Sequence, residues 1–368
     1  MDGNIASPLD YCRPAAARQL RGFPQNEAAE CLRLPNVELS RIETGLKAPP
    51  AQLLVAAAEV FSVPIEFFDQ TDTIYGAPVS VHPMWRKKSI VSATELHRIV
   101  AELNVRVVHI RKLLEATDLE PINKLPRLDS DEYGNDPEKI AALVRRFWLV
   151  PDGPIQDLTA LVEDAGILIA HSDLGGSSVS GVKFSVPGMP HMIVLNRVQS
   201  ADRMRFTLCH ELAHVIIHHY PTPNMEEEAN LFASCFLVPT DDVRSHFAGR
   251  KIDLRLLGAL KPEWKVSMAA LVFAAKRAGA INETQSQYLW KQFNIHNIKT
   301  RESPELDFSA EEPRTLSDLV SLHMNDMRYS LGELSKMLVM NEGELVKTYS
   351  IDLPGPEKGR TVHLRIIQ

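Results

Sequence analysis

The sequence predicts a mainly α-helical protein of the α+β class with a small mixed sheet. Apolar residues recur at helical spacing over long stretches, most clearly from Ser92 to Thr117 and from Ser200 to Tyr220. Two short apolar runs, Ile167–Ala170 and Met192–Leu195, are instead typical of buried strands. A chain of 368 residues exceeds one ordinary small domain, so we expect two or three.

Composition narrows the class of protein. The net charge of −7 provides no global positive field that would attract nucleic acid, so any DNA binding must come from a local surface. Residues 1–9 lack a basic start and an apolar core, which predicts no signal peptide. No apolar run approaches the ~20 residues that span a bilayer. The four cysteines show no paired spacing, which favours a reducing cytoplasm.

The N-terminal part contains three short helices separated by tight breaks. The pattern predicts helices over Pro24–Leu32, Asn36–Thr44 and Ala51–Phe61, with Gly45 as the C-cap of the second. Arg33-Leu34-Pro35 interrupts the first two. A helix, a tight turn and a second helix at this spacing indicate a helix-turn-helix bundle.

This bundle resembles the lambda-repressor-like family of DNA-binding domains. The resemblance rests on Gln25, Leu39–Gly45, Pro49-Pro50 and Val63–Phe68. Arg33 stands where the family's turn usually has glycine, so we expect a looser turn. The resemblance implies binding of double-stranded DNA, and it places these residues on or beside the recognition surface: Gln25, Asn36, Val37, Glu38, Ser40 and Arg41.

An alternative remains for this module. Its basic and acidic residues nearly balance, whereas phosphate contacts normally supply much of the affinity for DNA. The same helices would then serve for homodimerisation or for docking a partner.

The middle of the chain alternates helices and short strands. Ser92 is placed as the N-cap of the long helix that follows it. Residues 119–135 are polar and contain proline, which predicts a loop, and helices are expected over Glu138–Trp148 and Ile155–Asp164. The two apolar strands and a third over Val182-Lys183-Phe184, separated by a Gly/Ser-rich turn, give the small mixed sheet.

The next helix, Ser200–Tyr220, carries the motif His210-Glu211-Leu212-Ala213-His214. Two histidines four positions apart project from one helix face and can bind one metal ion. Glu211 follows the first histidine and is placed to act as the general base toward a metal-activated water. The pattern predicts a catalytic Zn²⁺ site rather than a structural one, because closed structural sites are usually rich in cysteine.

Catalytic zinc needs a third protein ligand, and the following helix, Glu226–Leu237, is its expected source. Of its first three glutamates we favour Glu226, because Asn230 lies four residues later on the same face and can support the ligands from behind. Glu227 and Glu228 fit a solvated acidic helix start.

These segments together resemble the ImmA/IrrE family of metallopeptidases. The resemblance covers approximately Ile140–Ile281 and rests on the segments Trp148–Pro154, Val194–Asn196, Arg203–His219, Glu226–Pro239 and Trp264–Leu271. It implies a gluzincin-like core with zinc held by the two histidines and a downstream glutamate, which falls on Glu226. It also implies cleavage of a partner protein, often a repressor of stress or mobile-element genes.

Several alternatives stay open around the motif. The chain can instead be a transcriptional regulator or an antitoxin-like DNA-binding protein whose peptidase domain senses or docks partners. His171, His191 and Tyr220 are candidates for stabilising the oxyanion, but the sequence does not place them. His218 and His219 are expected at the helix exit and not as ligands. Cys209 and Cys235 are expected in the core, with a redox thiol beside the zinc as the alternative.

The C-terminal part is predicted to be helical, with helices over Leu316–Met327 and Leu331–Tyr349 and an edge strand over Thr361–Ile367. The second of these helices faintly echoes a helix-turn-helix. We therefore expect a helix-turn-helix domain over 12–70, a linker and helical connector over 71–135, a zinc metallopeptidase domain over 136–285 and a C-terminal helical region over 286–368.

Overall fold

The computed structural model describes residues 13–76, 92–176, 179–220, 222–351 and 364–366. The predicted class is confirmed: the described residues are mostly helical, with a small three-stranded sheet and one strand pair. Residues 1–9, which bear on the signal-peptide prediction, and Cys12 lie outside the described residues. Among the described helices, none is both long and apolar enough to cross a bilayer.

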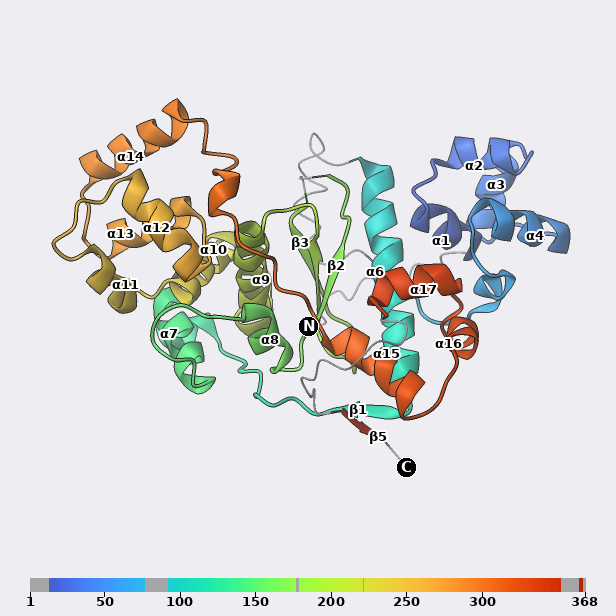
Figure 1. Ribbon diagram of the computed structural model, residues 1–368. Coiled ribbons are helices and arrows are strands. Elements are labelled where there is room, and N and C mark those ends of the chain that lie inside the picture. The colour runs from blue at the N-terminus through green and yellow to red at the C-terminus, as the bar shows by residue number, and fades with distance from the viewer. Residues whose placement is uncertain (1–12, 77–91, 177–178, 221, 352–363, 367–368) are drawn as a thin grey trace. The chain divides into compact units, whose positions relative to one another are not determined.

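The chain divides into two compact units, which are described separately. Unit 1 comprises residues 1–120, 184–190 and 314–368, and unit 2 comprises residues 121–183 and 191–313. Figure 1 colours the chain by residue number, so unit 1 contains both the blue and the red parts of the chain.

Unit 1 begins with the helix-turn-helix bundle. A proline with φ near −60° precedes the first helical residue of three of its helices, and this fixed φ prepares the chain to enter the helix. The elements are α1 (Arg13–Leu20), α2 (Gln25–Cys31), α3 (Asn36–Glu43), α4 (Ala51–Val60) and the 3₁₀ helix η1 (Ile65–Asp69).

The turn between α2 and α3 corrects one expectation. Arg33 adopts φ 54°, the left-handed conformation that glycine usually supplies at this position. The turn still closes, because the Leu34 N–H donates to the Ala29 carbonyl at 2.9 Å. The looser turn expected from the missing glycine was therefore wrong.

A buried ion pair fixes the orientation of this bundle. The Arg18 guanidinium on α1 donates to both carboxylate oxygens of Glu43 on α3, at 2.6 and 2.9 Å. Both side chains are buried beside apolar core residues that include Ala17, Leu39 and Phe61. A buried pair with both oxygens satisfied holds α1 and α3 in one register.

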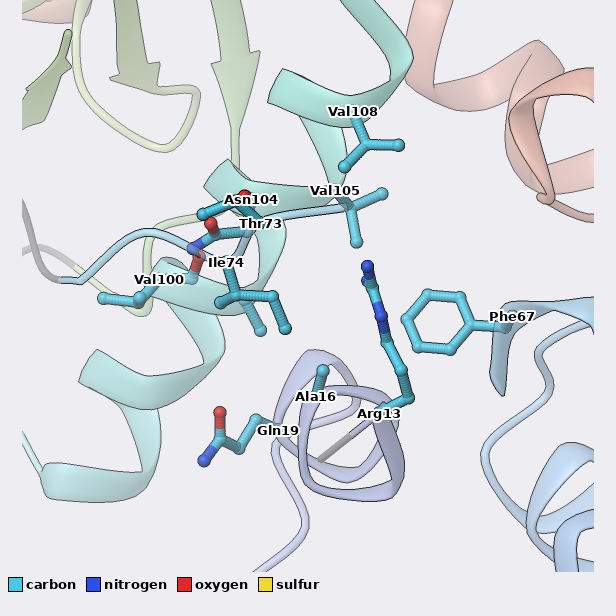
Figure 2. A pocket seen from close by; sticks show the side chains of 11 residues that line it. Arg13, Ala16, Gln19, Phe67, Thr73, Ile74, Val100, Asn104, Val105 and Val108 are labelled. Atoms are coloured by element: carbon cyan, nitrogen blue, oxygen red, sulfur yellow. Dashed lines mark hydrogen bonds between the residues drawn. The ribbon is translucent and has the colours of Figure 1, made fainter. Parts of the chain in front are cut away.

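The long helix α6 (Ala93–Leu114) follows, and the predicted N-cap is confirmed because Ser92 Oγ accepts a hydrogen bond from the Glu95 N–H. α1 packs on α6, and a small cleft lies between them (Figure 2). Arg13 extends across this cleft and donates to the carbonyls of Gln70 and Asp72, both at 2.8 Å. The buried amide of Asn104 on α6 holds the same linker by bonding the N–H and C=O of Tyr75.

Unit 1 ends with a second helix-turn-helix. We expected one helix over Leu331–Tyr349, and this was wrong because Val339 adopts φ 52° and breaks it. The turn repeats that between α2 and α3: the Met340 N–H donates to the Ser335 carbonyl five residues earlier, at 3.1 Å. The elements are α15 (Thr315–Asn325), α16 (Leu331–Leu338) and α17 (Glu342–Tyr349), which Figure 1 shows in orange and red beside α6.

Polar contacts join this C-terminal bundle to the rest of unit 1. Arg21 donates to both carboxylate oxygens of Glu344, at 2.6 and 2.7 Å. Tyr349 Oη is 2.8 Å from Nδ1 of His109 on α6. The predicted edge strand is confirmed as β5 (Leu364–Ile366), which pairs antiparallel with β1 (Thr117–Leu119).

Unit 2 contains the three-stranded sheet in the order β2-β4-β3. β2 and β4 run parallel, with Leu168 opposite Met192. The Asn196 N–H donates to the Ser180 carbonyl, so the end of β4 lies beside the start of β3. This pair therefore runs antiparallel, and the sheet is mixed. The strands are β2 (Leu168–Ser172), β3 (Gly181–Phe184) and β4 (Met192–Asn196).

Among the helices of unit 2, α9 lies next to this sheet (Figure 1). It packs against β4 on one side and α10 on the other, while α10 also packs on α7 (Figure 1). The helices are α7 (Pro137–Phe147), α8 (Leu158–Glu163), α9 (Ala201–Ile216), α10 (Met225–Leu237), α11 (Thr240–Phe247), α12 (Leu254–Trp264), α13 (Met268–Arg277) and α14 (Glu283–Ile295), with 3₁₀ turns η3 (Ser130–Tyr133) and η4 (Pro304–Leu306).

Candidate metal centre

The candidate centre lies on α9, which is buried over most of its length. Leu208, Leu212 and Ile216 anchor one face of the helix in the core of unit 2. His210 and His214 lie on the other face, one turn apart, and their ring centroids are 4.7 Å from each other. The apolar face therefore fixes the helix, and the 3.6-residue period aims both imidazoles at one point.

Glu226, in the first turn of α10, completes a group of three donors. His210 Nε2 and His214 Nε2 are 3.1 Å apart, and the Glu226 carboxylate lies 3.4 Å from the first and 3.6 Å from the second. Tetrahedral ligands at ~2.0–2.1 Å from zinc lie roughly 3.3 Å from one another. The spacing and the His₂Glu chemistry of the donors thus fit a zinc ion.

The three donors differ in their exposure to solvent. The His214 side chain is only 3% exposed, whereas that of Glu226 is 51% exposed. The group is therefore closed on the side of the α9 helix and open on the side of Glu226. A catalytic site needs such an open side, because water and substrate must reach the metal.

Glu211 is buried beside these donors. Burial raises the pKa of its carboxyl group from 4.5 to about 7, against the opposing effects of His210 and Lys183. The backbone N–H of Lys183 on β3 donates to this carboxylate. Its other oxygen, Oε2, has no hydrogen-bond partner among the described residues. A carboxyl group with a pKa near neutrality and one unpartnered oxygen is suited to accept and release protons.

The protonation of the histidines is set by their surroundings. Burial, together with the charges of His210 and His218, lowers the pKa of His214, which favours the neutral ring that a metal requires. Burial also lowers the pKa of His210, but hydrogen bonding to Glu226 and the charges of Glu211 and Glu226 outweigh it and raise that pKa. The hydrogen bond from His210 lowers the pKa of Glu226.

Behind the donors lies a second layer, which the sequence revealed only in part. Asn230 Oδ1 is 3.1 Å from His210 Nδ1, so the amide contacts the histidine rather than Glu226. His218 was expected only at the helix exit, yet its ring is buried, 2.8 Å from His214 Nδ1 and 3.0 Å from Glu228. Its position four residues after His214 was the signal that could have revealed this contact.

Comparison with protein families identifies this part of the chain. Residues 162–276 match the model of a peptidase family described as the IrrE N-terminal-like domain. The match contains Glu211, His210, His214 and Glu226. The chain carries an IrrE N-terminal-like domain. It also carries an N-terminal helix-turn-helix domain, since residues 15–68 match the model of that family. A search of the curated proteins gives no match to the chain.

Two arginines just outside the residues that match the IrrE N-terminal-like domain contact the C-terminal end of α10, and Arg145 is the more deeply buried of the two. Arg145 on α7 donates to the carbonyls of Phe236, Pro151 and Gly153, at 2.7 to 2.8 Å. Arg277 on α13 donates to the carbonyl of Val238 and to the hydroxyl of Ser234. Both cations thus satisfy carbonyls at the C-terminal end of α10, which leaves its N-terminal turn to present Glu226.

The remaining candidates of the IrrE-like domain lie in different settings. His171 on β2 is 3.5 Å from Glu312, and Tyr220 is 77% exposed. Burial lowers the pKa of His191, and the nearby charges of Lys183 and His219 lower it further. Cys209 is fully buried in the core, and this burial raises the pKa of its thiol to about 12. Cys235 is buried in the same core.

The six residues expected to contact DNA are distributed over α2 and α3. Asn36, Val37 and Arg41 are exposed on α3, Val37 by 67%. Ser40 is half-buried on the same helix. Two members are engaged within the domain: Glu38 forms an ion pair with Lys47, and the Gln25 amide donates to Glu43 at 2.8 Å. Gln25 therefore keeps one N–H for another acceptor, because the other is bound to Glu43.

Proposed function

We propose that this protein is a regulatory zinc endopeptidase that hydrolyses a peptide bond in a specific partner protein, a transcriptional repressor. The chain combines a helix-turn-helix domain with a domain of a peptidase family. The observation that supports the chemistry is the convergence of His210, His214 and Glu226 beside the buried carboxyl group of Glu211. The chain also carries a domain of a DNA-binding family, and this supports a regulatory protein as the substrate rather than proteins in general.

The residues of the site divide the work of peptide hydrolysis. His210, His214 and Glu226 would hold the zinc ion, which supplies Lewis acidity that acidifies water and polarises a peptide carbonyl. Glu211 takes the proton of the attacking water at its unpartnered Oε2. It then passes this proton to the nitrogen of the leaving amine. The Lys183 N–H donates to the carboxylate of Glu211 and so limits its rotation.

Metal analysis tests the site without knowledge of the substrate. Wild-type protein is expected to bind one equivalent of zinc, and His214→Ala and Glu226→Ala are expected to lose it. Glu227→Gln is the matched control, because Glu227 is exposed and adjacent to Glu226 on α10. A wild-type protein that binds no zinc after dialysis against the free metal would rule out the proposal.

Proteolysis is tested by comparing wild-type protein with Glu211→Gln in the source cells. Protein N-termini that appear only with the wild type identify the substrate and its cleavage site. The zinc content of Glu211→Gln should remain, because Glu211 is not one of the three donors. Identical sets of N-termini with both proteins would contradict the proposed activity.

A second candidate function is double-stranded DNA binding by the N-terminal domain, with the peptidase domain sensing or docking partners. The exposure of Asn36, Val37 and Arg41 on one helix favours it. Selection from random duplexes is expected to enrich one sequence, and Arg41→Ala should lower the salt dependence of affinity by roughly one phosphate contact. Failure to enrich any sequence would remove this function.

A further inference from the structure

His218 occupies a position that the proposed zinc chemistry does not use. It follows the last turn of α9, yet its side chain is only 2% exposed. Its Nδ1 is 2.8 Å from His214 Nδ1, and its Nε2 is 3.0 Å from Glu228 Oε2. The rings of His214 and His218 have centroids 4.9 Å apart. His214 on α9, His218 just after it and Glu228 on α10 thus form one continuous hydrogen-bonded series.

The tautomers in this series are determined if His214 binds a metal through Nε2. A ligating Nε2 carries a lone pair, so the neutral ring must carry its proton on Nδ1 and donate it to His218 Nδ1. His218 Nδ1 is then an acceptor, and its own proton lies on Nε2. That proton is donated to the carboxylate of Glu228, which can only accept. Each group in the series therefore has one role.

We infer that His218 and Glu228 are positioning residues that fix the tautomer and ring orientation of His214 for metal binding. The inference rests on the proposed zinc site. A carboxylate that ends such a series makes the ligating nitrogen a better donor, as outer partners of metal-binding histidines commonly do. The carboxylate of Glu228 contacts His218 and not His214, so its effect on His214 is transmitted through the ring of His218.

The two histidine ligands are supported differently. His210 Nδ1 is paired with the neutral amide of Asn230, at 3.1 Å. His214 Nδ1 is paired through His218 with a full negative charge. The side chain of Glu228 is 18% exposed, whereas the neighbouring Glu227 is exposed, so the three glutamates of α10 have three separate settings. Removing the charge of Glu228 should therefore weaken the metal site, and removing that of Glu227 should not.

The test is the zinc affinity of the full chain, measured by competition with a chelator. Glu228→Gln and His218→Leu are each expected to weaken zinc binding roughly 10- to 100-fold, the range seen when outer partners of metal ligands are removed. His218→Asn keeps an acceptor near the position of Nδ1 and should lose less than His218→Leu. Glu227→Gln and His219→Asn are the matched controls, and both should bind zinc as the wild type does.

Thermal unfolding of the metal-free proteins separates positioning from a merely structural role. If Glu228→Gln and His218→Leu bind zinc with wild-type affinity, the inference is overturned, whatever happens to their metal-free stability. The proposed site would survive that result, provided that His214→Ala abolishes zinc binding. A wild-type chain that binds no zinc overturns both, because a series that positions His214 then has no metal to serve.

Discussion

Glu211 gives a prediction in which stability and pH are linked. The pKa of its carboxyl group rises from 4.5 to about 7 on folding, mainly because the group is buried. Below pH 4.5 the carboxyl is protonated in the folded and unfolded states, and no penalty arises. As the pH rises from 4.5 to 7 the unfolded chain releases the proton first, so stability falls. Above pH 7 the whole penalty is present.

The magnitude follows from the size of the pKa change. Each pKa unit corresponds to about 1.4 kcal/mol, so a rise of about 2.5 costs the metal-free protein roughly 3 kcal/mol at pH 8. Glu211→Gln removes the ionisable group and with it this penalty. The amide leaves a buried N–H₂ where Oε2 lacked a partner, which costs about 1–3 kcal/mol at every pH. The pH dependence of the difference, and not its absolute value, is therefore diagnostic.

The assay is urea unfolding of wild type and Glu211→Gln at pH 4.5 and pH 8 with a chelator present. Tryptophan fluorescence reports on unit 2, which contains Trp148, Trp264 and Trp290 of the four tryptophans. Relative to wild type, the variant should gain about 3 kcal/mol between the two pH values. Glu227→Gln, at an exposed position, should show no comparable gain. A difference between Glu211→Gln and wild type that is the same at both pH values would refute the reasoning.

Three further changes test other parts of the structure. Lys183→Met removes a charge that lowers the pKa of Glu211, so the fall in the stability of the metal-free protein should extend to higher pH in the same urea assay. An unchanged pH range of this fall would contradict the prediction. Arg33→Gly relieves a left-handed residue in an exposed position and should raise the stability of unit 1 by about 0.5–1 kcal/mol in calorimetry, whereas Arg33→Ala, which keeps the unfavourable φ, should not. A double-mutant cycle on Arg21 and Glu344, whose side chains are 24% and 31% exposed, should give a coupling of about 0.5–1 kcal/mol that shrinks in salt, and a coupling of zero would show that the contact does not join the two bundles.

Helix α9, which carries the two candidate histidine ligands, was the most predictable part of the structure. Residues four apart on a helix face the same way whatever surrounds them, so local geometry alone brings His210 and His214 together. Choosing among Glu226, Glu227 and Glu228 was harder, because all three suit an acidic first turn. The structure separates them through contacts with α9: Glu226 reaches the two histidines, Glu228 reaches His218, and Glu227 is exposed. These contacts join residues of α10 to residues on or just after α9. The spacing of apolar residues along the sequence does not predict them.

The break between α16 and α17 was indicated only by a faint resemblance to a helix-turn-helix, for a different reason. Helix ends are recognised by glycine or proline, and here a valine takes the left-handed conformation at φ 52°. β-branched residues are among the least suited to that region, so nothing local marks the end of the helix. Val339 packs against the core of the N-terminal bundle, and this tertiary contact is available to offset the strain.

The two helix-turn-helix pairs share a backbone conformation but differ in the surfaces that they present. Both turns place a non-glycine residue at positive φ, and both are closed by a hydrogen bond to a carbonyl five residues earlier. The second helices differ in what they present: α3 exposes Asn36, Val37 and Arg41, whereas α17 begins with Glu342 and turns Glu344 to Arg21. The acidic first turn of α17 would repel the phosphates of DNA. Because α17 is also held by Arg21, it is not free to enter the major groove. We therefore expect DNA contacts from α3 and an architectural role for α17, because chemistry at the surface, and not the fold, decides between them.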